Sequence, residues 1–155
     1  MDTVAGSKYR FGPHEIDERQ VFRTSPLSFA IVNIRPTRPG HVLVCPKRLV
    51  KRFADLSPDE TSDLWIMAKE IGARVEQYHR ASSLTFTIQD GPHSGQTVPH
   101  VHVHIVPRRK EDFENNDNNN GMYIVDIFRI FLRGTANLKH MYNANETQCW
   151  FEEIE

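Results

Sequence analysis

Three histidines that alternate with β-branched residues constrain this chain more than any other feature. They are His100, His102 and His104, and valine or isoleucine fills the positions between and just after them. Because these apolar residue types favour strands, we predict a strand over residues 100–107. Side chains two positions apart in a strand share a face. Three imidazoles should therefore project from one side of a sheet, while the apolar side chains enter a core on the other.

Such a row of imidazoles fits two chemistries. Histidines can bind zinc, or they can act as nucleophile, phosphate ligand and proton donor near neutral pH. Zinc-bound histidines are usually oriented by carboxylates, but Asp90 is the only acid between residues 88 and 110. Neutral donors and backbone N–H groups, which suit a phosphate, come instead from Gln89, Gly91, Gly95, Gln96 and Thr97. We therefore favour phosphate chemistry and expect no metal ligand set.

One helix is clearly predicted upstream of this motif, over about residues 58–79. Ser57 is a natural N-cap, Pro58 suits the first helical position, and Glu60 completes a capping box. Apolar residues then recur at steps of three and four, which predicts one stripe facing a core. The stripe consists of Leu64, Met67, Ile71, Val75 and Tyr78.

The remaining strand signals predict an antiparallel sheet. Short apolar or alternating segments begin at Phe22 and cover residues 29–33, 41–45 and 84–89. A turn rich in proline and glycine at residues 36–40 makes two of these segments antiparallel neighbours. Together with the histidine strand, they predict an α+β domain with about five strands and one long covering helix.

Composition restricts the partners and the compartment. The net charge of the 155 residues is −1, so no positive field exists to bind nucleic acid or an acidic membrane. Cys45 and Cys149 lie far apart, which favours a reducing compartment. The longest apolar stretch, residues 122–132, contains two charges and is too short to cross a bilayer. We expect a cytoplasmic protein, with the nucleus as a second location.

Residues 95–108 resemble the signature of the histidine triad (HIT) family, His-x-His-x-His flanked by apolar residues. They are most similar to the Fhit branch, the bis(5'-adenosyl)-triphosphatases, which hydrolyse dinucleoside polyphosphates and favour diadenosine triphosphate. Further segments resemble the same branch in order and spacing, namely residues 28–33, 39–46, 83–86 and 89–92.

The resemblance implies a HIT-like domain over residues 9–117 that forms a homodimer. Residues 1–8 are polar and expected to be loose. From about residue 118 the chain follows an asparagine-rich tract and no longer resembles the family. Residues 118–155 are therefore expected to be a divergent C-terminal tail, whose structure the sequence does not predict.

The resemblance also implies roles for individual residues. His102 is expected to attack the α-phosphorus and form a covalent adenylyl-histidine, and His104 to hold α-phosphate oxygens. His100 and His41 are expected to orient this pair, and Gln89 to contact the bridging and leaving-group oxygens. The other implied contacts are backbone N–H groups around the phosphates at Gly95, Gln96, Thr97 and Val98, a ribose contact at Asn33, a further nucleotide contact at His14, and an adenine pocket of Phe11, Ile16 and Leu43.

These roles predict hydrolysis of diadenosine triphosphate and related dinucleoside polyphosphates to AMP and ADP through the adenylyl-histidine. No tightly bound cofactor is expected, and Mg²⁺ or Mn²⁺ would arrive with the substrate phosphates. Three alternatives stay open. The chain could hydrolyse adenylyl sulfate or nucleoside phosphoramidates, it could be a nucleotide-binding signalling module, or, least favoured, it could bind zinc.

Overall fold

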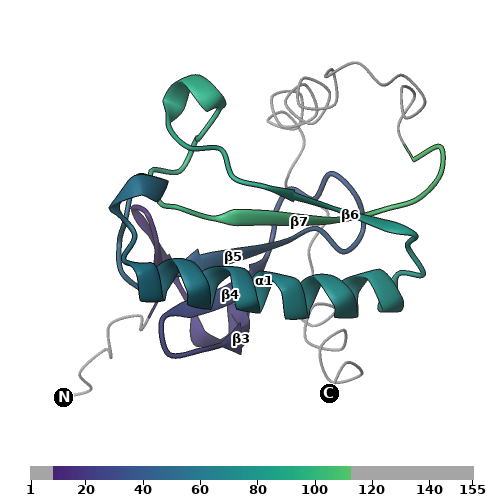
Figure 1. The fold of residues 1–155 in the computed structure, drawn as a ribbon, viewed down its shortest axis with the longest axis horizontal. Helices are drawn as coiled ribbons and strands as arrows, with labels where there is room; N and C mark the ends of the chain where they lie inside the picture. Colours follow the sequence, from purple (N-terminus) through teal and green to yellow (C-terminus); the bar gives the residue numbers. More distant parts are fainter. Residues whose placement is uncertain (1–8, 113–155) are drawn as a thin grey trace.

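A computed structural model describes residues 9–112 of the chain, and Figure 1 shows one long helix along one side of a sheet. The predicted tail over residues 118–155 and the predicted loose residues 1–8 lie outside the described residues. In chain order the elements are β1 (Tyr9–Phe11), β2 (His14–Ile16), the 3₁₀ helix η1 (Glu18–Gln20), β3 (Val21–Thr24), β4 (Ser28–Val32), β5 (Val42–Pro46), η2 (Phe53–Asp55), α1 (Pro58–Tyr78), β6 (Ser83–Thr87), η3 (Pro92–Ser94) and β7 (Val103–Arg108).

Among the described residues, the main sheet has five antiparallel strands in the order β3-β4-β5-β7-β6, and β1 and β2 form a separate hairpin. Over residues 9–112 this arrangement confirms the predicted α+β class, with one helix against a five-stranded antiparallel sheet. Within residues 9–112, no helix is long and apolar enough to cross a membrane.

Helix α1 begins where the sequence predicts. The Ser57 hydroxyl accepts a hydrogen bond from the Glu60 N–H at 3.1 Å, and the Glu60 carboxylate accepts one from the Ser57 N–H at 2.8 Å. Two nitrogens of Arg48 hold the same carboxylate, each at 2.7 Å. The prediction for Tyr78 is wrong, because this last helical residue is exposed and its ring packs edge-on against His79.

The two faces of the main sheet carry different apolar clusters. On the α1 side, alternate residues of the central strands join the helix stripe in the main core. On the other side, the β1–β2 hairpin contributes Tyr9 and Ile16 to a second cluster with Phe29, Leu43 and Cys45. Burying each large apolar side chain stabilises the fold by about 1.5–3 kcal/mol. The hairpin is therefore fixed over the face opposite α1.

The predicted strand over residues 100–107 is shorter than expected, because β7 begins only at Val103. Continuing the β5–β7 register would place Val101 opposite Pro46, which has no N–H to donate. The Pro46 carbonyl instead accepts a hydrogen bond from the His100 ring, and the Val101 N–H donates to the Val50 carbonyl. The alternation of faces still holds, since Val101 and Val103 belong to the α1-side core.

Candidate active site

The predicted histidines come together on the face of the sheet opposite α1. The ring centroids of His102 and His104 are 4.7 Å apart, and those of His104 and His41 are 5.2 Å apart. His104 pairs in register with Leu43 of the hairpin-side cluster, which fixes the face. The Phe11 ring meets His102 edge-on at 4.9 Å. The four histidines with predicted catalytic roles, His41, His100, His102 and His104, are all buried.

The tautomer of His102 is set by the backbone. Its Nδ1 lies 2.7 Å from the carbonyl oxygen of His100, which can only accept, so Nδ1 carries the proton. His100 is fixed in turn, because its Nε2 donates to the Pro46 carbonyl at 2.8 Å and its Nδ1 accepts from the Gly12 N–H at 3.2 Å. The neutral His102 ring therefore keeps its lone pair on Nε2, the atom needed for attack on phosphorus.

His41 sets the tautomer of His104 in the same way. The Thr37 N–H donates to Nδ1 of His41 at 3.2 Å, so the His41 proton lies on Nε2. That nitrogen is 2.9 Å from Nδ1 of His104, which accepts the bond. Nε2 of His104 then carries the proton and is a hydrogen-bond donor. Asn33 also lies beside His41: its side-chain amide nitrogen, a donor, is 3.4 Å from the accepting Nδ1 of His41, and its side-chain oxygen accepts the Arg35 N–H at 3.1 Å.

Burial keeps these imidazoles neutral. Loss of water lowers the pKa of His102 to about 4 and the pKa of His41 to about 3. The pKa of His104 is well below its usual range, because burial is reinforced by repulsion from His102 and His41. Burial also lowers the pKa of His100. At neutral pH the site therefore presents one ring with a free lone pair and a neighbouring ring that donates a proton.

Gln89 lies on the same face of the sheet as His102. The β6–β7 register pairs Thr87 with His104. Continued by two residues, this register places Gln89 opposite His102 and on the same face. Gln89 is largely buried, and its amide makes no hydrogen bond with any described residue. Its predicted role remains a prediction, but its position is compatible with that role.

The loop over residues 91–98 supplies fewer donors than predicted. The backbone N–H groups of Gly95 and Gln96 already donate to carbonyls of the same loop, so they are occupied. The N–H groups of Thr97 and Val98 donate to no group within residues 9–112. The expected phosphate donors of this loop are thus Thr97 and Val98. The N–H groups of Gly95 and Gln96 are instead used within the tight turn at Gly95, where φ is +84°.

The predicted nucleotide contacts are only partly assembled. Ile16 and Leu43 are buried in the hairpin-side cluster, and the partly buried Phe11 packs against it, so the three residues predicted to bind adenine lie close together. His14 pairs with Phe11 across the hairpin, but it is exposed. Asn33 is buried beside His41.

Sequence reasoning missed the groups that set the tautomers. These are the N–H of Gly12, the N–H of Thr37 and the carbonyl of Pro46. Every residue type has a backbone carbonyl and almost every one an N–H, so no residue type marks these positions. Only the proline- and glycine-rich turn before His41 pointed to a tightly folded connection.

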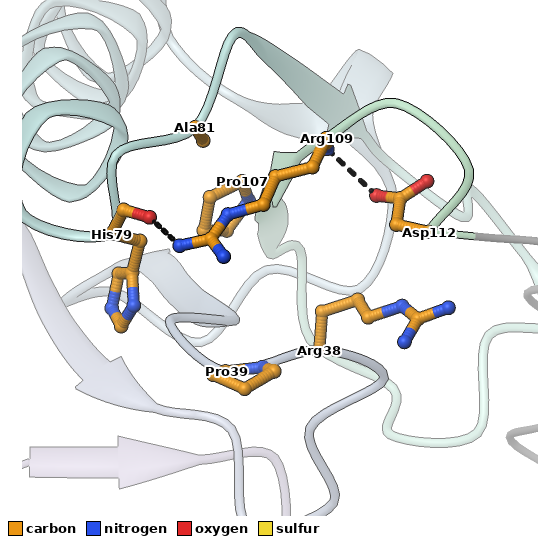
Figure 2. Close-up of a pocket in the computed structure, with 7 residues that line it drawn as sticks. All are labelled: Arg38, Pro39, His79, Ala81, Pro107, Arg109 and Asp112. Atoms are coloured by element: carbon orange, nitrogen blue, oxygen red, sulfur yellow. Dashed lines mark hydrogen bonds between the residues drawn. The ribbon is translucent and has the colours of Figure 1, made fainter.

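A separate cavity of about 270 Å³ lies between the β4–β5 connection, the end of α1 and the end of β7. The two guanidinium groups that line this cavity do not converge. The Arg109 guanidinium donates a hydrogen bond to the His79 carbonyl, whereas the Arg38 guanidinium points away from that of Arg109 (Figure 2). The cavity is therefore not a candidate anion site. Its lining consists of Arg38, Pro39, His79, Ala81, Pro107, Arg109 and Asp112. In the described part of the chain, no three potential metal ligands are grouped to hold a metal ion.

Comparison with known proteins gives a family match over most of the described residues. The profile of the HIT domain matches residues 14–111. A bifunctional bis(5'-adenosyl)-triphosphatase/adenylylsulfatase from Arabidopsis thaliana is 63% identical over 111 residues, which are 72% of this chain and 62% of that protein. A bis(5'-adenosyl)-triphosphatase from Dictyostelium discoideum is 55% identical over 107 residues, which are 69% of this chain and 72% of that protein. The chain thus spans 62% of the Arabidopsis relative's length.

A solved structure has the same fold. It is the Plasmodium falciparum diadenosine triphosphate hydrolase in complex with Cyclomarin A. The match has a TM-score of 0.68 and 28% identity, and it covers 98% of this chain and 88% of that one.

Proposed function

Because this chain belongs to the HIT domain family, we propose that it hydrolyses diadenosine triphosphate and related dinucleoside polyphosphates to AMP and ADP. The observation that carries the proposal is the 2.7 Å hydrogen bond from Nδ1 of His102 to the His100 carbonyl. It aims an unprotonated Nε2 away from the backbone in a site where burial lowers the pKa of His102 to about 4. Two relatives with 63% and 55% identity bear the name bis(5'-adenosyl)-triphosphatase, which supports this substrate.

In the first step, Nε2 of His102 attacks the α-phosphorus and forms a P–N bond. The bond from that phosphorus to the bridging oxygen breaks, and ADP leaves with the electron pair. Donors must meet the negative charge that develops on the phosphate oxygens. The protonated Nε2 of His104 and the N–H groups of Thr97 and Val98 have the chemistry for this role, and the Gln89 amide can contact the leaving oxygen.

In the second step, water attacks the α-phosphorus of the adenylyl-histidine. The P–N bond breaks, its electron pair returns to Nε2 of His102, AMP leaves with the oxygen of the water, and one proton of the water passes to solvent. The neutral ring is regenerated without any net change in the protein. A divalent cation, Mg²⁺ or Mn²⁺, would be bound by the substrate phosphates rather than by the protein.

A second activity is hydrolysis of adenylyl sulfate. The Arabidopsis relative at 63% identity is named as an adenylylsulfatase as well as a triphosphatase. The same attack by His102 would then expel sulfate in place of ADP. The second step, release of AMP by water, would be unchanged.

We also propose that the chain is a homodimer joined at the β6 edge. Strand β6 is the last strand in the sheet order, so its outer edge pairs with no described strand. Two large aromatic side chains, Phe86 of β6 and Trp65 of α1, are exposed at 40% and 38%. Phe86 lies against α1, because a Cβ on Gly72 would come within 2.7 Å of its ring. A second copy paired there would cover both the open edge and the exposed rings.

The decisive experiment compares the wild type with His102→Asn on diadenosine triphosphate, with AMP and ADP quantified by chromatography. The asparagine amide can replace the Nδ1 donor but has no nucleophilic Nε2. We expect turnover to fall by roughly three orders of magnitude or more, with substrate affinity retained. His93→Asn, which changes an exposed histidine, is the matched control and should keep wild-type turnover.

Equal turnover of the wild type and His102→Asn would refute the role of His102. The same assay with EDTA tests the metal alternative. If wild-type activity is lost and only zinc restores it, the zinc interpretation replaces the present one.

A further inference from the structure

Residues 50–53, named here the bracing segment, contact residues 90–101, the stretch that leads to His102, at four points. The Val50 carbonyl accepts the Val101 N–H at 2.7 Å. The Lys51 carbonyl accepts the side-chain amide of Gln96 at 2.9 Å. The other two points are the Arg52 side chain and the Phe53 N–H, and both bind Asp90. The segment thus bridges the start, the middle and the end of the loop that precedes His102.

Asp90 is the central point of this attachment. Its carboxylate accepts Nε of Arg52 at 3.0 Å, Nη2 of Arg52 at 3.2 Å and the Phe53 N–H at 2.8 Å. The first two bonds form the two-pronged arrangement in which a planar guanidinium fixes direction as well as distance. The Arg52 guanidinium, followed by the Phe53 N–H, holds the pKa of Asp90 below its usual range. Asp90 is therefore an anchored carboxylate directly after Gln89.

The guanidinium also packs against the residue that starts the loop. Gly91 has φ of +100°, and a Cβ there would lie 3.3 Å from Cζ of Arg52. The Gly91 carbonyl then accepts the N–H groups of Ser94 and Gln96, each at 3.1 Å. The direction in which the loop leaves Gly91 thus depends on Arg52 and Asp90.

We propose that Arg52 and Asp90 are positioning residues for the reaction. They hold Gln89 on one side of the ion pair, and the loop carrying Thr97 and Val98 on the other, at the place where the leaving phosphate develops charge. The inference rests on the proposed function and deepens it. Neither residue belongs to the apolar cluster of the expected adenine pocket. The pair should therefore affect the chemical step more than the binding of the adenylyl group.

The exposure of the pair allows positioning to be separated from stability. The side chains of Arg52 and Asp90 are 55% and 34% exposed, and ion pairs this accessible contribute little to folding stability. A small misplacement of a group that contacts the reacting atoms can nevertheless cost about 100-fold in rate. A loss of kcat without a matching loss of stability is the expected signature.

The test measures kcat, KM, AMP affinity and Tm for Arg52→Ala, Asp90→Ala and the double variant. We expect kcat for diadenosine triphosphate to fall about 10- to 100-fold. AMP affinity should stay within about twofold, and the double variant should be no slower than the slower single one, because both changes remove the same contact. Asp90→Asn, which keeps an acceptor for the Phe53 N–H, should recover part of the rate.

Arg23→Ala is the matched control, because it breaks another exposed ion pair, that with Glu70 at 2.9 Å, far from the loop in the chain. Its kcat should equal that of the wild type, and its Tm change should resemble that of Arg52→Ala. The inference is overturned if Arg52→Ala and Asp90→Ala keep kcat within twofold, or if AMP affinity falls as much as kcat.

Hydrogen–deuterium exchange over residues 88–99 supplies a readout that needs no turnover. Both alanine variants should exchange faster there than the wild type, since the Ser94 and Gln96 N–H groups lose their fixed acceptor. A wild-type chain that does not cleave diadenosine triphosphate contradicts the proposed function. In that case unchanged exchange overturns the positioning role as well, and faster exchange upholds it.

Discussion

The four buried histidines form two hydrogen-bonded pairs, and each pair is anchored to the backbone of a distant segment. His102 donates to the carbonyl of His100, which is held between Pro46 and Gly12. His104 accepts from His41, which is held by Thr37. As a result, Nε2 of His102 has a lone pair that can accept, and Nε2 of the neighbouring His104 has a proton that can be donated in a hydrogen bond.

The hydrogen bond from His41 to His104 predicts that two substitutions of His41 lower kcat/KM to different extents. His41→Ala removes the donor that keeps the proton of His104 on Nε2, and we expect kcat/KM to fall about 10- to 100-fold, because a group that contacts the reacting atoms is then misplaced. His41→Gln should recover much of this loss, because its amide nitrogen can donate from nearly the same place. Steady-state kinetics of the two variants checks the prediction, and equal losses would contradict it.

The connection between β4 and β5 is the element that links His41 to the rest of the fold. Gly40 precedes His41 with φ of +88°, a conformation that side chains rarely adopt. A Cβ there would lie 2.8 Å from the Pro107 side chain, and the His79 ring would be closer still. The end of α1 and the end of β7 therefore press against this turn and fix its path into β5.

Gly40→Ala should consequently destabilise the protein by about 2–4 kcal/mol, combining backbone strain with overpacking. Urea denaturation gives the free energy of unfolding directly. The variant Gly40→Ala/His79→Ala should recover part of the loss, because it removes the ring but not the strain at φ. Stability of Gly40→Ala within about 0.5 kcal/mol of the wild type would show that the turn adapts freely.

For the whole molecule, the buried histidines couple folding to pH. Burial lowers the pKa of His102 to about 4 and of His41 to about 3, while in the unfolded chain both have ordinary values near 6.5. Between about pH 6.5 and pH 4 the unfolded chain binds protons that the folded chain does not. Stability is therefore fully present above this window and falls as the pH falls through it, by up to about 1.4 kcal/mol per pH unit for each histidine.

Unfolding free energies measured at pH 7, 6 and 5 should show this decline. His102→Asn should reduce the slope by about one proton, because it removes one imidazole that stays neutral in the folded state. An identical slope for His102→Asn and the wild type would mean that His102 is not held neutral by burial.

The proposed dimer is also a property of the whole molecule. Sedimentation equilibrium of the wild type at micromolar concentration should give twice the chain mass, and Phe86→Lys should shift the population to monomer because it places a charge in the interface. Ile34→Lys changes an apolar residue that is 69% exposed next to β4, and it should remain dimeric. A monomeric wild type would exclude the interface at β6.

The sequence by itself determined the features that depend on neighbouring residues. Helix α1 could be predicted because its capping box and apolar stripe lie within one segment. The two faces of the histidine strand followed from alternation alone, and the family resemblance then supplied an expected role for each histidine. Periodicity is a property of local backbone geometry, so it can be read without knowing the fold.

Only the tertiary structure decided which protons and which donors the site presents. The late start of β7 depends on Pro46 facing Val101, the tautomer of His104 depends on the Thr37 N–H, and the loop is held by Arg52 and Asp90. These partners come from segments far apart in the chain, and many of them are backbone groups. Since backbone groups are nearly the same in every residue, the sequence does not indicate which of them pair. Their pairing is decided only when packing brings the segments together.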